Sequence, residues 1–278
     1  MEGVPEPSET GRPRSHTAPD QGRPNRDGSP DNPGSAQHRG ERLLAAIRRS
    51  RMLGRLSADD LPAVLASSRI VRGGPNARVL RRTDDAVVIL LTGAAKEHAS
   101  NLEGFDVVLR VLGPGDTAGL TGVMALDGRA NVTAIEESEA LLIEGSDLRK
   151  LAGRNPDLAR GWADTTTRQL ADMRQELILF AATSTAERVI HRLVELTDRW
   201  GVPGEQGVSV SAHLTQEELA SWAGASREST ARVLQSLRRA GILTTSRRTL
   251  VVHEPDQLRR RAGTTLDLTV TEAMPILR

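Results

Sequence analysis

The strongest structural signal in the chain is the segment LTQEELASWAGASRESTARVLQSLRRAGIL, residues 214–243. Within it, Thr215 and Glu218 match the capping-box pattern that marks the start of a helix. Gly224 can adopt the left-handed conformation needed for a sharp turn, and Ser226 is a favourable cap for a second helix. Two short helices joined by a turn that contains glycine form a helix-turn-helix motif. The segment therefore predicts this motif.

The second predicted helix begins after Ser226 and ends at Gly241, where a glycine favours helix termination. Arg227, Glu228 and Arg232 are expected on its outer face, in the turns that enter the major groove of DNA. Arginine matches guanine O6 and N7, and glutamate accepts a hydrogen bond from cytosine N4. We therefore predict that these three residues read base pairs. The inner face is predicted to consist of Thr230, Val233, Leu234 and Leu237.

Positive charge concentrates around this motif. Residues 226–248 contain six arginines and one acidic residue, a local net charge of +5, whereas the whole chain carries +1. Residues 243–253 predict a two-stranded wing with Ser246, Arg247 and Arg248 at its tip, where arginines suit DNA phosphates. The alternative is a pair of helices whose arginine face is merely solvated. The caps, the glycine, the outward residues and the basic wing together favour DNA binding.

Upstream, residues 69–144 consist of short apolar or alternating runs separated by Gly, Pro and Asp turns. The runs are residues 69–71, 78–80, 87–91, 107–112, 132–135 and 140–143. Many short strands at regular spacing are typical of an antiparallel sandwich or barrel. The predicted fold class is therefore α+β, with an antiparallel β domain ahead of the helix-turn-helix.

Helices are predicted on both sides of these strands. Short helices are expected in residues 39–52, from Ser57, and in 145–152. Asn155, Pro156 and Asp157 predict the start of a long helix that continues to about Phe180. Its apolar positions are Leu158, Trp162, Leu170, Met173, Leu177 and Phe180.

The long helix needs a cover for its apolar stripe. The same helix of a second copy is the favoured cover, and packing on the chain's own domain is the alternative. After it, Ser184 predicts a helix to Trp200, residues 201–207 a loop, and residues 208–210 a short strand.

The two ends of the chain have a different composition. Residues 1–38 are rich in Pro, Gly, Ser, Asp and Arg and almost devoid of apolar residues, so we predict that they are disordered. No apolar run reaches the roughly 20 residues that span a bilayer, and the N-terminus lacks a hydrophobic signal core. We therefore expect a soluble, cytoplasmic protein.

Composition excludes several kinds of site. The chain has no cysteine, which excludes disulfides, Cys-ligated zinc or haem, and iron–sulfur clusters. The six histidines show no ligand spacing, so no metal is expected. Of the 37 basic residues only Lys96 and Lys150 are lysines, which leaves 35 arginines as forked donors for phosphates and guanines. An aromatic content of 2% argues against a stacking platform for single strands. No catalytic constellation is found, so an enzyme is not predicted.

The segment 224–232, GASRESTAR, resembles the recognition-helix pattern of the CRP/FNR family of transcription regulators. In that pattern Ser-Arg-Glu is followed by a second arginine four residues after the glutamate. The resemblance covers residues 56–254. It implies a cyclic-nucleotide-binding β-roll, a long dimerisation helix and a C-terminal winged helix-turn-helix. It also implies a homodimer on a palindromic operator with half-sites like TGTGA. By the same resemblance, Arg227, Glu228 and Arg232 read the bases, and Thr215, Gln216 and Ser226 lie near phosphates.

The sensory half departs from the family pattern. Residues 113–116, Gly-Pro-Gly-Asp, are similar to the turn before the nucleotide cassette. Members that bind cyclic AMP have Gly-Glu-Leu where this chain has Gly119-Leu120-Thr121, so the carboxylate that holds the ribose hydroxyl is missing. They have Arg-Ser where this chain has Arg129-Ala130. Arg129 can still bind a phosphate, or it is only an exposed turn residue. The candidate effector residues are Gly119, Leu120, Thr121, Arg129 and Ala130, with a cyclic nucleotide as the candidate ligand and cAMP disfavoured.

These features predict a homodimeric, sequence-specific DNA-binding regulator. Either a small effector in the β-roll controls it, or the effector domain has changed or lost its ligand. The expected partners are double-stranded DNA, a second copy and RNA polymerase, with no membrane. The alternative is a nucleotide-sensing module whose output is protein–protein contact and which does not bind DNA even at low salt. The predicted domains are a tail (1–38), the β-roll (39–153), the dimerisation helix (154–181), the winged helix-turn-helix (182–262) and a C-terminal tail (263–278).

Overall fold

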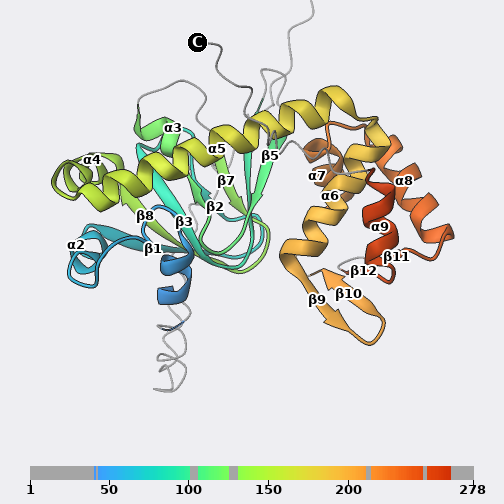
Figure 1. The fold of residues 1–278 in the computed structure, drawn as a ribbon, viewed down its shortest axis with the longest axis horizontal. Helices are drawn as coiled ribbons and strands as arrows, with labels where there is room; N and C mark the ends of the chain where they lie inside the picture. Colours follow the sequence, from blue (N-terminus) through green and yellow to red (C-terminus); the bar gives the residue numbers. More distant parts are fainter. Residues whose placement is uncertain are drawn as a thin grey trace, which may run out of the picture.

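The computed structural model describes residues 41, 43–100, 106–124, 131–210, 214–246 and 249–263. The predicted disordered tail at residues 1–38, and the predicted C-terminal tail beyond residue 263, lie outside these residues. The predicted α+β class is confirmed. An antiparallel β domain, a long helix and a helix-turn-helix unit follow one another along the chain (Figure 1).

The described residues of the β domain form two four-stranded sheets, and every pairing between these strands is antiparallel. The first sheet has the order β1 (Ser68–Gly73), β8 (Ser138–Glu144), β3 (Ala86–Thr92) and β6 (Thr117–Ala118). The second has the order β2 (Arg78–Leu80), β7 (Asn131–Ala134), β4 (Ala95–Ser100) and β5 (Asp106–Leu112).

Strand β3 shows why the sequence forms this domain. All but the last of its residues are buried, because both faces of its sheet are covered. Val88 and Leu90 point into the space between the two sheets, together with Ala95 and Leu112 of the second sheet. Alternate residues of β3 pack on the other side with the helices that flank the sheet. A strand covered on both faces has a continuous apolar sequence, and residues 86–91 have it.

Short or medium helices accompany the sheets, among them α2 (Leu61–Ala66), α3 (Leu120–Val123) and α4 (Gly145–Arg154), and residues 43–49 are also helical, as predicted for residues 39–52. Helix α5 (Pro156–Ala182) has 27 residues, and Asn155 caps it by accepting a hydrogen bond from Leu158 N at 2.8 Å. Figure 1 shows α5 running from the β domain to the helix-turn-helix unit, so the two halves share one long helix.

In the described part of the C-terminal unit the helices are α6 (Thr185–Trp200), α7 (Gln216–Trp222), α8 (Arg227–Arg239) and α9 (Pro255–Arg261). A sheet of four short strands completes it, in the order β11 (Leu243–Thr245), β12 (Leu250–Val252), β10 (Gly207–Val210) and β9 (Gly201–Gly204). The hairpin of β11 and β12 is the predicted wing.

The structure corrects one prediction and adds elements that were not predicted. The loop predicted at residues 201–207 is wrong, because residues 201–204 form β9 and pair with β10. Three glycines and one proline in that segment weaken the strand signal in the sequence. Strand β4 was not predicted because its sequence, AKEHAS, carries charges, and α9 was not predicted because its sequence, PDQLRRR, has a single apolar residue.

Candidate nucleic-acid interface

The helix-turn-helix is formed by α7 and α8, and local side chains set both helix starts. Thr215 and Glu218 form a complete capping box: Glu218 N donates to Thr215 Oγ1 at 3.1 Å, and Thr215 N donates to a carboxylate oxygen of Glu218 at 2.8 Å. Ser226 caps α8 by accepting a hydrogen bond from Ser229 N at 3.1 Å. Gly224 between the helices has φ of +56°, a conformation that favours glycine.

The three predicted base-reading residues lie together on the exposed face of α8. Arg227 and Glu228 occupy its first turn and Arg232 follows one turn later, and all three are exposed. Arg232 Nη2 is 3.9 Å from Glu228 Oε1, which is a loose exposed contact that a base can displace at little cost. The buried face of α8 consists of Thr230, Leu234 and Leu237. The helix therefore presents guanidinium, carboxylate and guanidinium groups outward.

Three of the five predicted phosphate-binding residues belong to the described part of the chain, and these three lie at helix starts. Thr215, Gln216 and Ser226 are exposed at the starts of α7 and α8, where unpaired backbone N–H groups favour anions. The wing tip closes with a hydrogen bond from Ser246 N to Thr249 O at 2.8 Å. Arg247 and Arg248 lie outside the described residues.

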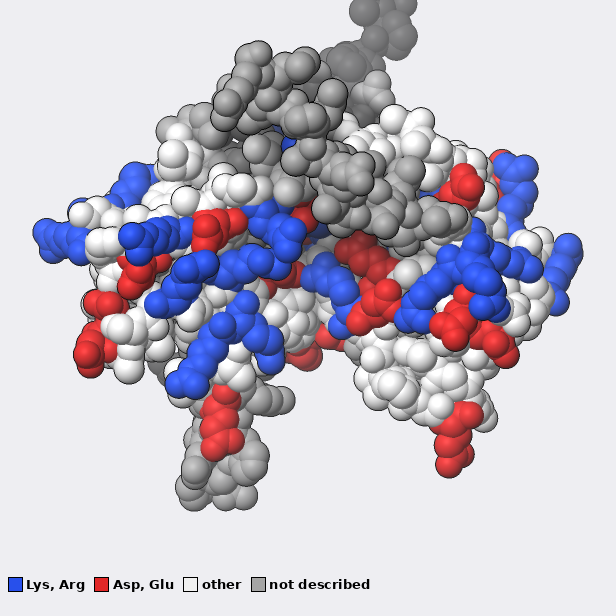
Figure 2. Space-filling model, in the orientation of Figure 1, with Lys and Arg blue, Asp and Glu red and all other residues white. Residues whose placement is uncertain are grey.

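Basic side chains also gather beyond α8. Figure 2 shows them over the right-hand part of the molecule, where Figure 1 places α6, α8 and α9, with acidic side chains among them. The last turn of α9 contributes Arg259, Arg260 and Arg261, and α8 contributes Arg238 and Arg239. The cluster extends the positive charge of the unit past the predicted wing.

Arg188 on α6 was missed by the sequence analysis. Its guanidinium donates to Ala223 O at 2.9 Å and Gly224 O at 3.1 Å, which belong to the turn before α8, and to Thr183 O at 2.9 Å. It also lies 4.9 Å from the centre of the Phe180 ring. A Cβ at Gly224 would lie 2.3 Å from that same ring. The turn before α8 is therefore tied directly to the end of α5.

Arg192, one turn further along α6, is a buried charge that was also missed. It pairs with Glu176 of α5 and with Glu195 at 3.1 Å, and it lies 4.7 Å from the centre of the Trp222 ring. Burial by itself would lower the pKa of Arg192. The hydrogen bonds and charges of Glu176 and Glu195 outweigh that effect, so the pKa is raised and the charge is retained.

Helix α5 exposes an apolar stripe along its second half. Leu170, Met173 and Leu177 are 60, 64 and 70% exposed, and Phe180 is 43% exposed. Their spacing of three, four and three residues is that of a coiled-coil seam. Large apolar side chains this exposed on one helix face are typical of a surface that another chain covers.

The predicted effector residues are only partly described. Gly119 has φ of +91°, and a Cβ there would lie 2.4 Å from Ala86 O, so the turn requires glycine. Leu120 points into the core, and Thr121 is exposed at the start of α3. Arg129 and Ala130 lie outside the described residues. The buried position of Leu120 gives this residue a packing role that the sequence alone did not show.

A polar network lies beside this turn. Arg110 of β5 pairs with Glu97 of β4 and donates to Thr117 O at 2.7 Å. Gln169 of α5 donates to the same carbonyl oxygen at 2.8 Å. The network therefore joins the strands of the second sheet, the segment that leads to Gly119, and the long helix.

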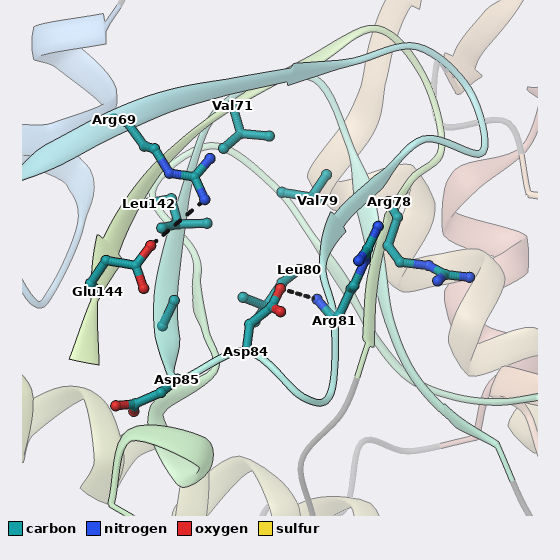
Figure 3. Close-up of a pocket in the computed structure, with 11 residues that line it drawn as sticks. Arg69, Val71, Arg78, Val79, Leu80, Arg81, Asp84, Asp85, Leu142 and Glu144 are labelled. Atoms are coloured by element: carbon teal, nitrogen blue, oxygen red, sulfur yellow. Dashed lines mark hydrogen bonds and ion pairs between the residues drawn. The ribbon is translucent and has the colours of Figure 1, made fainter. Parts of the chain in front are cut away.

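A hollow of about 490 Å³ opens between β1, β8 and the turn that joins β2 to β3 (Figure 3). Val71, Leu80 and Leu142 are among its apolar lining. Arg69 and Glu144 face each other across one side, at 3.7 Å. Gly119, Leu120 and Thr121 are not in its lining. The described part of the predicted effector segment therefore does not line the hollow, although Gly119 lies against Leu80 and Ala86, which do.

Within the described ranges, no group of three or more His, Asp or Glu side chains could hold a metal ion. His191 lies partly buried on α6, and burial lowers its pKa. In the same part of the chain, none of the helices is both long and apolar enough to cross a membrane.

Comparisons with known proteins agree with this geometry. Residues 187–261 match the model of the Crp-like helix-turn-helix domain, and residues 75–155 match that of the cyclic nucleotide-binding domain. The chain is 26% identical over 179 residues to the CRP-like cAMP-activated global transcriptional regulator of Mycobacterium tuberculosis, covering 64% of this chain and 80% of that protein. It is 29% identical over 170 residues to the cyclic AMP receptor protein of Thermus thermophilus, covering 61% and 76%.

The fold is also similar to solved structures. The crystal structure of a CRP-family transcriptional regulator from Thermus thermophilus matches with a TM-score of 0.61 at 22% identity. The match covers 70% of this chain and 97% of that one.

Proposed function

Because the chain belongs to the CRP/FNR family of transcription regulators, we propose that it acts as a homodimer that reads a palindromic, TGTGA-like operator through α8. The family consists of transcription regulators rather than enzymes. The observation that carries the proposal is the exposed row of Arg227, Glu228 and Arg232 at the start of a capped helix. In a helix-turn-helix this part of the second helix lies in the major groove.

The proposal assigns a role to each segment. Residues 154–181 form the dimerisation helix, residues 182–262 the DNA-binding domain, and residues 39–153 the sensory domain. Thr215, Gln216, Ser226, Arg247 and Arg248 bind phosphates and set the register on the duplex. The dimer works in the cytoplasm, and RNA polymerase is its expected protein partner.

Removing either base-reading arginine should lower discrimination between operator and scrambled DNA. Arg227→Ala and Arg232→Ala are each expected to cost roughly 1–3 kcal/mol of binding free energy on a TGTGA-N6-TCACA duplex. The loss should be largest for the guanine that each arginine contacts, because a bidentate contact carries the sequence information. Fluorescence anisotropy with the palindrome and with single-base variants measures both effects.

Arg239→Ala is the matched control, since Arg239 is exposed on the same helix but lies at its far end. It should leave the ratio of specific to non-specific affinity unchanged. Arg248→Ala should weaken all duplexes alike and flatten the salt dependence. Unchanged discrimination in both Arg227→Ala and Arg232→Ala would refute the assigned readout.

The same proposal includes a small effector in the β-roll, with cAMP disfavoured. Leu120 stands where cAMP binders have a carboxylate, and its side chain is buried in the core cluster that includes Val123 and Leu158. The ribose hydroxyl of bound cAMP would therefore lack its hydrogen bond to a carboxylate. A hydrogen bond to a charged group contributes about 1.5–3 kcal/mol of binding free energy. We expect no saturable heat from cAMP at millimolar concentration in calorimetry of the purified dimer, with cGMP and cyclic dinucleotides titrated in parallel. Tight cAMP binding that raises operator affinity would contradict this expectation.

A further inference from the structure

Helix α7 lies against strand β5 of the chain's own β domain. Among the described strands, β5 is at one edge of its sheet, so one side of its backbone faces away from that sheet. Ser221 of α7 fills this position. Its Oγ accepts a hydrogen bond from Val108 N at 3.0 Å and donates one to Asp106 O at 2.8 Å. One side chain thus satisfies both a donor and an acceptor of the strand edge.

A charged pair lies beside this contact. Lys96 Nζ of β4 is 2.5 Å from Glu218 Oε1 of α7, and the side chains are only 13 and 18% exposed. Burial would raise the pKa of Glu218, but hydrogen bonds from Lys96 and Thr215 outweigh it, so the pKa is lowered and the carboxylate stays charged. An ion pair shielded from water to this degree is screened far less than a surface pair.

Apolar packing fills the space between these polar contacts. Val108 and Val111 of β5 belong to the same buried cluster as Leu219 and Trp222 of α7. Arg199 of α6 adds a further tie, donating to Val111 O at 3.0 Å and pairing with Asp116 in the turn before β6. We call this set the β5–α7 contact. Its apolar centre and paired polar groups hold the two domains in one relative orientation.

The β5–α7 contact leaves the DNA-reading face of α8 exposed. Figure 1 shows α7 between β5 and α8, so the β domain packs on one side of α7 and the recognition helix on the other. The contact therefore does not cover Arg227, Glu228 or Arg232. The contact fixes the orientation of α8 relative to the β domain and α5.

We propose that Ser221, Lys96 and Glu218 are positioning residues for DNA recognition, because the β5–α7 contact sets the separation of the two recognition helices and so selects the spacing of the half-sites. This inference rests on the proposed dimeric, DNA-binding function. When the β domain of each copy holds its recognition helix rigidly, the two helices fit half-sites about 34–36 Å apart, which is one turn of the duplex. If each DNA-binding unit can instead rotate about the junction of α5 and α6, at Thr183 and Ser184, the dimer accepts several half-site spacings.

The double variant Ser221→Ala/Glu218→Gln tests this inference in the full-length protein. Glutamine retains the capping box and alanine is a good helix former, so α7 keeps its own start and helicity. The strand-edge hydrogen bonds and the negative charge of the pair are removed. Affinities are measured for the palindrome, for duplexes with spacers one or two base pairs shorter or longer, and for a single half-site duplex.

The wild-type protein is expected to bind one half-site spacing more tightly than the others. In the double variant the ratio of affinities for the preferred and the other spacings should fall by about three- to tenfold, as expected for the loss of one or two hydrogen bonds. Affinity for the single half-site should stay unchanged, which a general loss of structure would not allow. Glu217→Gln, the same substitution on the neighbouring exposed residue, and Ser146→Ala, on the distant helix α4, are the matched controls and should keep the full preference.

Two results overturn the inference alone: a double variant that keeps the full spacing preference, or one that loses half-site affinity by the same factor. A wild-type protein that does not discriminate TGTGA duplexes from scrambled DNA overturns the proposed function, and this inference with it. The two failures are therefore distinguishable from the wild-type measurement.

Discussion

Replacing Leu177 by glutamate is expected to convert the proposed dimer into monomers. Affinity for a palindromic operator should then fall by about 10²–10⁴-fold, which is the gain in affinity that linking two binding units provides. Leu177 is 70% exposed and lies between Met173 and Phe180 on the apolar stripe of α5. In a two-fold symmetric interface the same patch of each copy meets its twin, so the two new carboxylates would lie close together. Burying two like charges without partners opposes association strongly.

Light scattering coupled to size-exclusion chromatography measures the mass of the variant, and anisotropy measures its affinity. Gln175→Glu is the matched control, because it adds the same charge to an exposed position outside the stripe. It should remain dimeric. Affinity of Leu177→Glu for a single half-site should match that of the wild type, since α8 is unchanged. A Leu177→Glu protein that stays dimeric would show that the stripe is not the interface.

The helix-turn-helix could be predicted because its signals are local. The cap or turn role of each residue that defines the motif depends only on neighbours a few positions away in the sequence. In the structure all of them have the predicted cap or turn roles: Thr215, Glu218, Gly224 and Ser226. Caps and left-handed turns depend on backbone geometry that a short segment sets on its own. The class of the β domain could be predicted for a similar reason, and the structure confirms it. Alternating apolar runs indicate strands with one buried face, and continuous apolar runs indicate strands with two buried faces.

The contacts between segments could not be predicted in the same way. Ser221 bonds to a strand more than a hundred residues earlier, and Arg192 pairs with a carboxylate on another helix. Nothing within a few residues of either position marks these partners. Their existence depends on how α5 places the two halves of the molecule, which is a property of the whole fold.

Arg110 is an intermediate case. In the sequence of β5, DVVLRVL, the period of two from Leu112 places Arg110 on the inner face of the sheet. A charged residue at an inward position is a signal of a buried or half-buried polar network, although it does not name the partners. The structure supplies them as Glu97 and the carbonyl of Thr117.

The second large effect is expected at Arg192. Its side chain is only 4% exposed, and it joins α5, α6 and α7 through Glu176, Glu195 and the carbonyl of Trp222 at 3.3 Å. Arg192→Ala should lower the free energy of unfolding of the DNA-binding unit by about 3 kcal/mol, the lower end of the range for breaking a buried pair. The lower end applies because Glu176 is 39% exposed and can be rehydrated when its partner is lost.

Urea unfolding followed by tryptophan fluorescence reports on this change, because Trp222 lies under the Arg192 guanidinium. Arg259→Ala is the matched control: its ion pair with Asp198 is half exposed, so the loss of unfolding free energy should stay within about 1 kcal/mol.

The double variant Arg192→Met/Glu176→Gln should recover part of the stability, since it removes both charges and keeps an apolar side chain over the Trp222 ring. A recovery would show that the cost of Arg192→Ala arises from the stranded carboxylate. An Arg192→Ala loss no larger than that of Arg259→Ala would mean that the buried Arg192 pair does not stabilise the junction of α5 and α6.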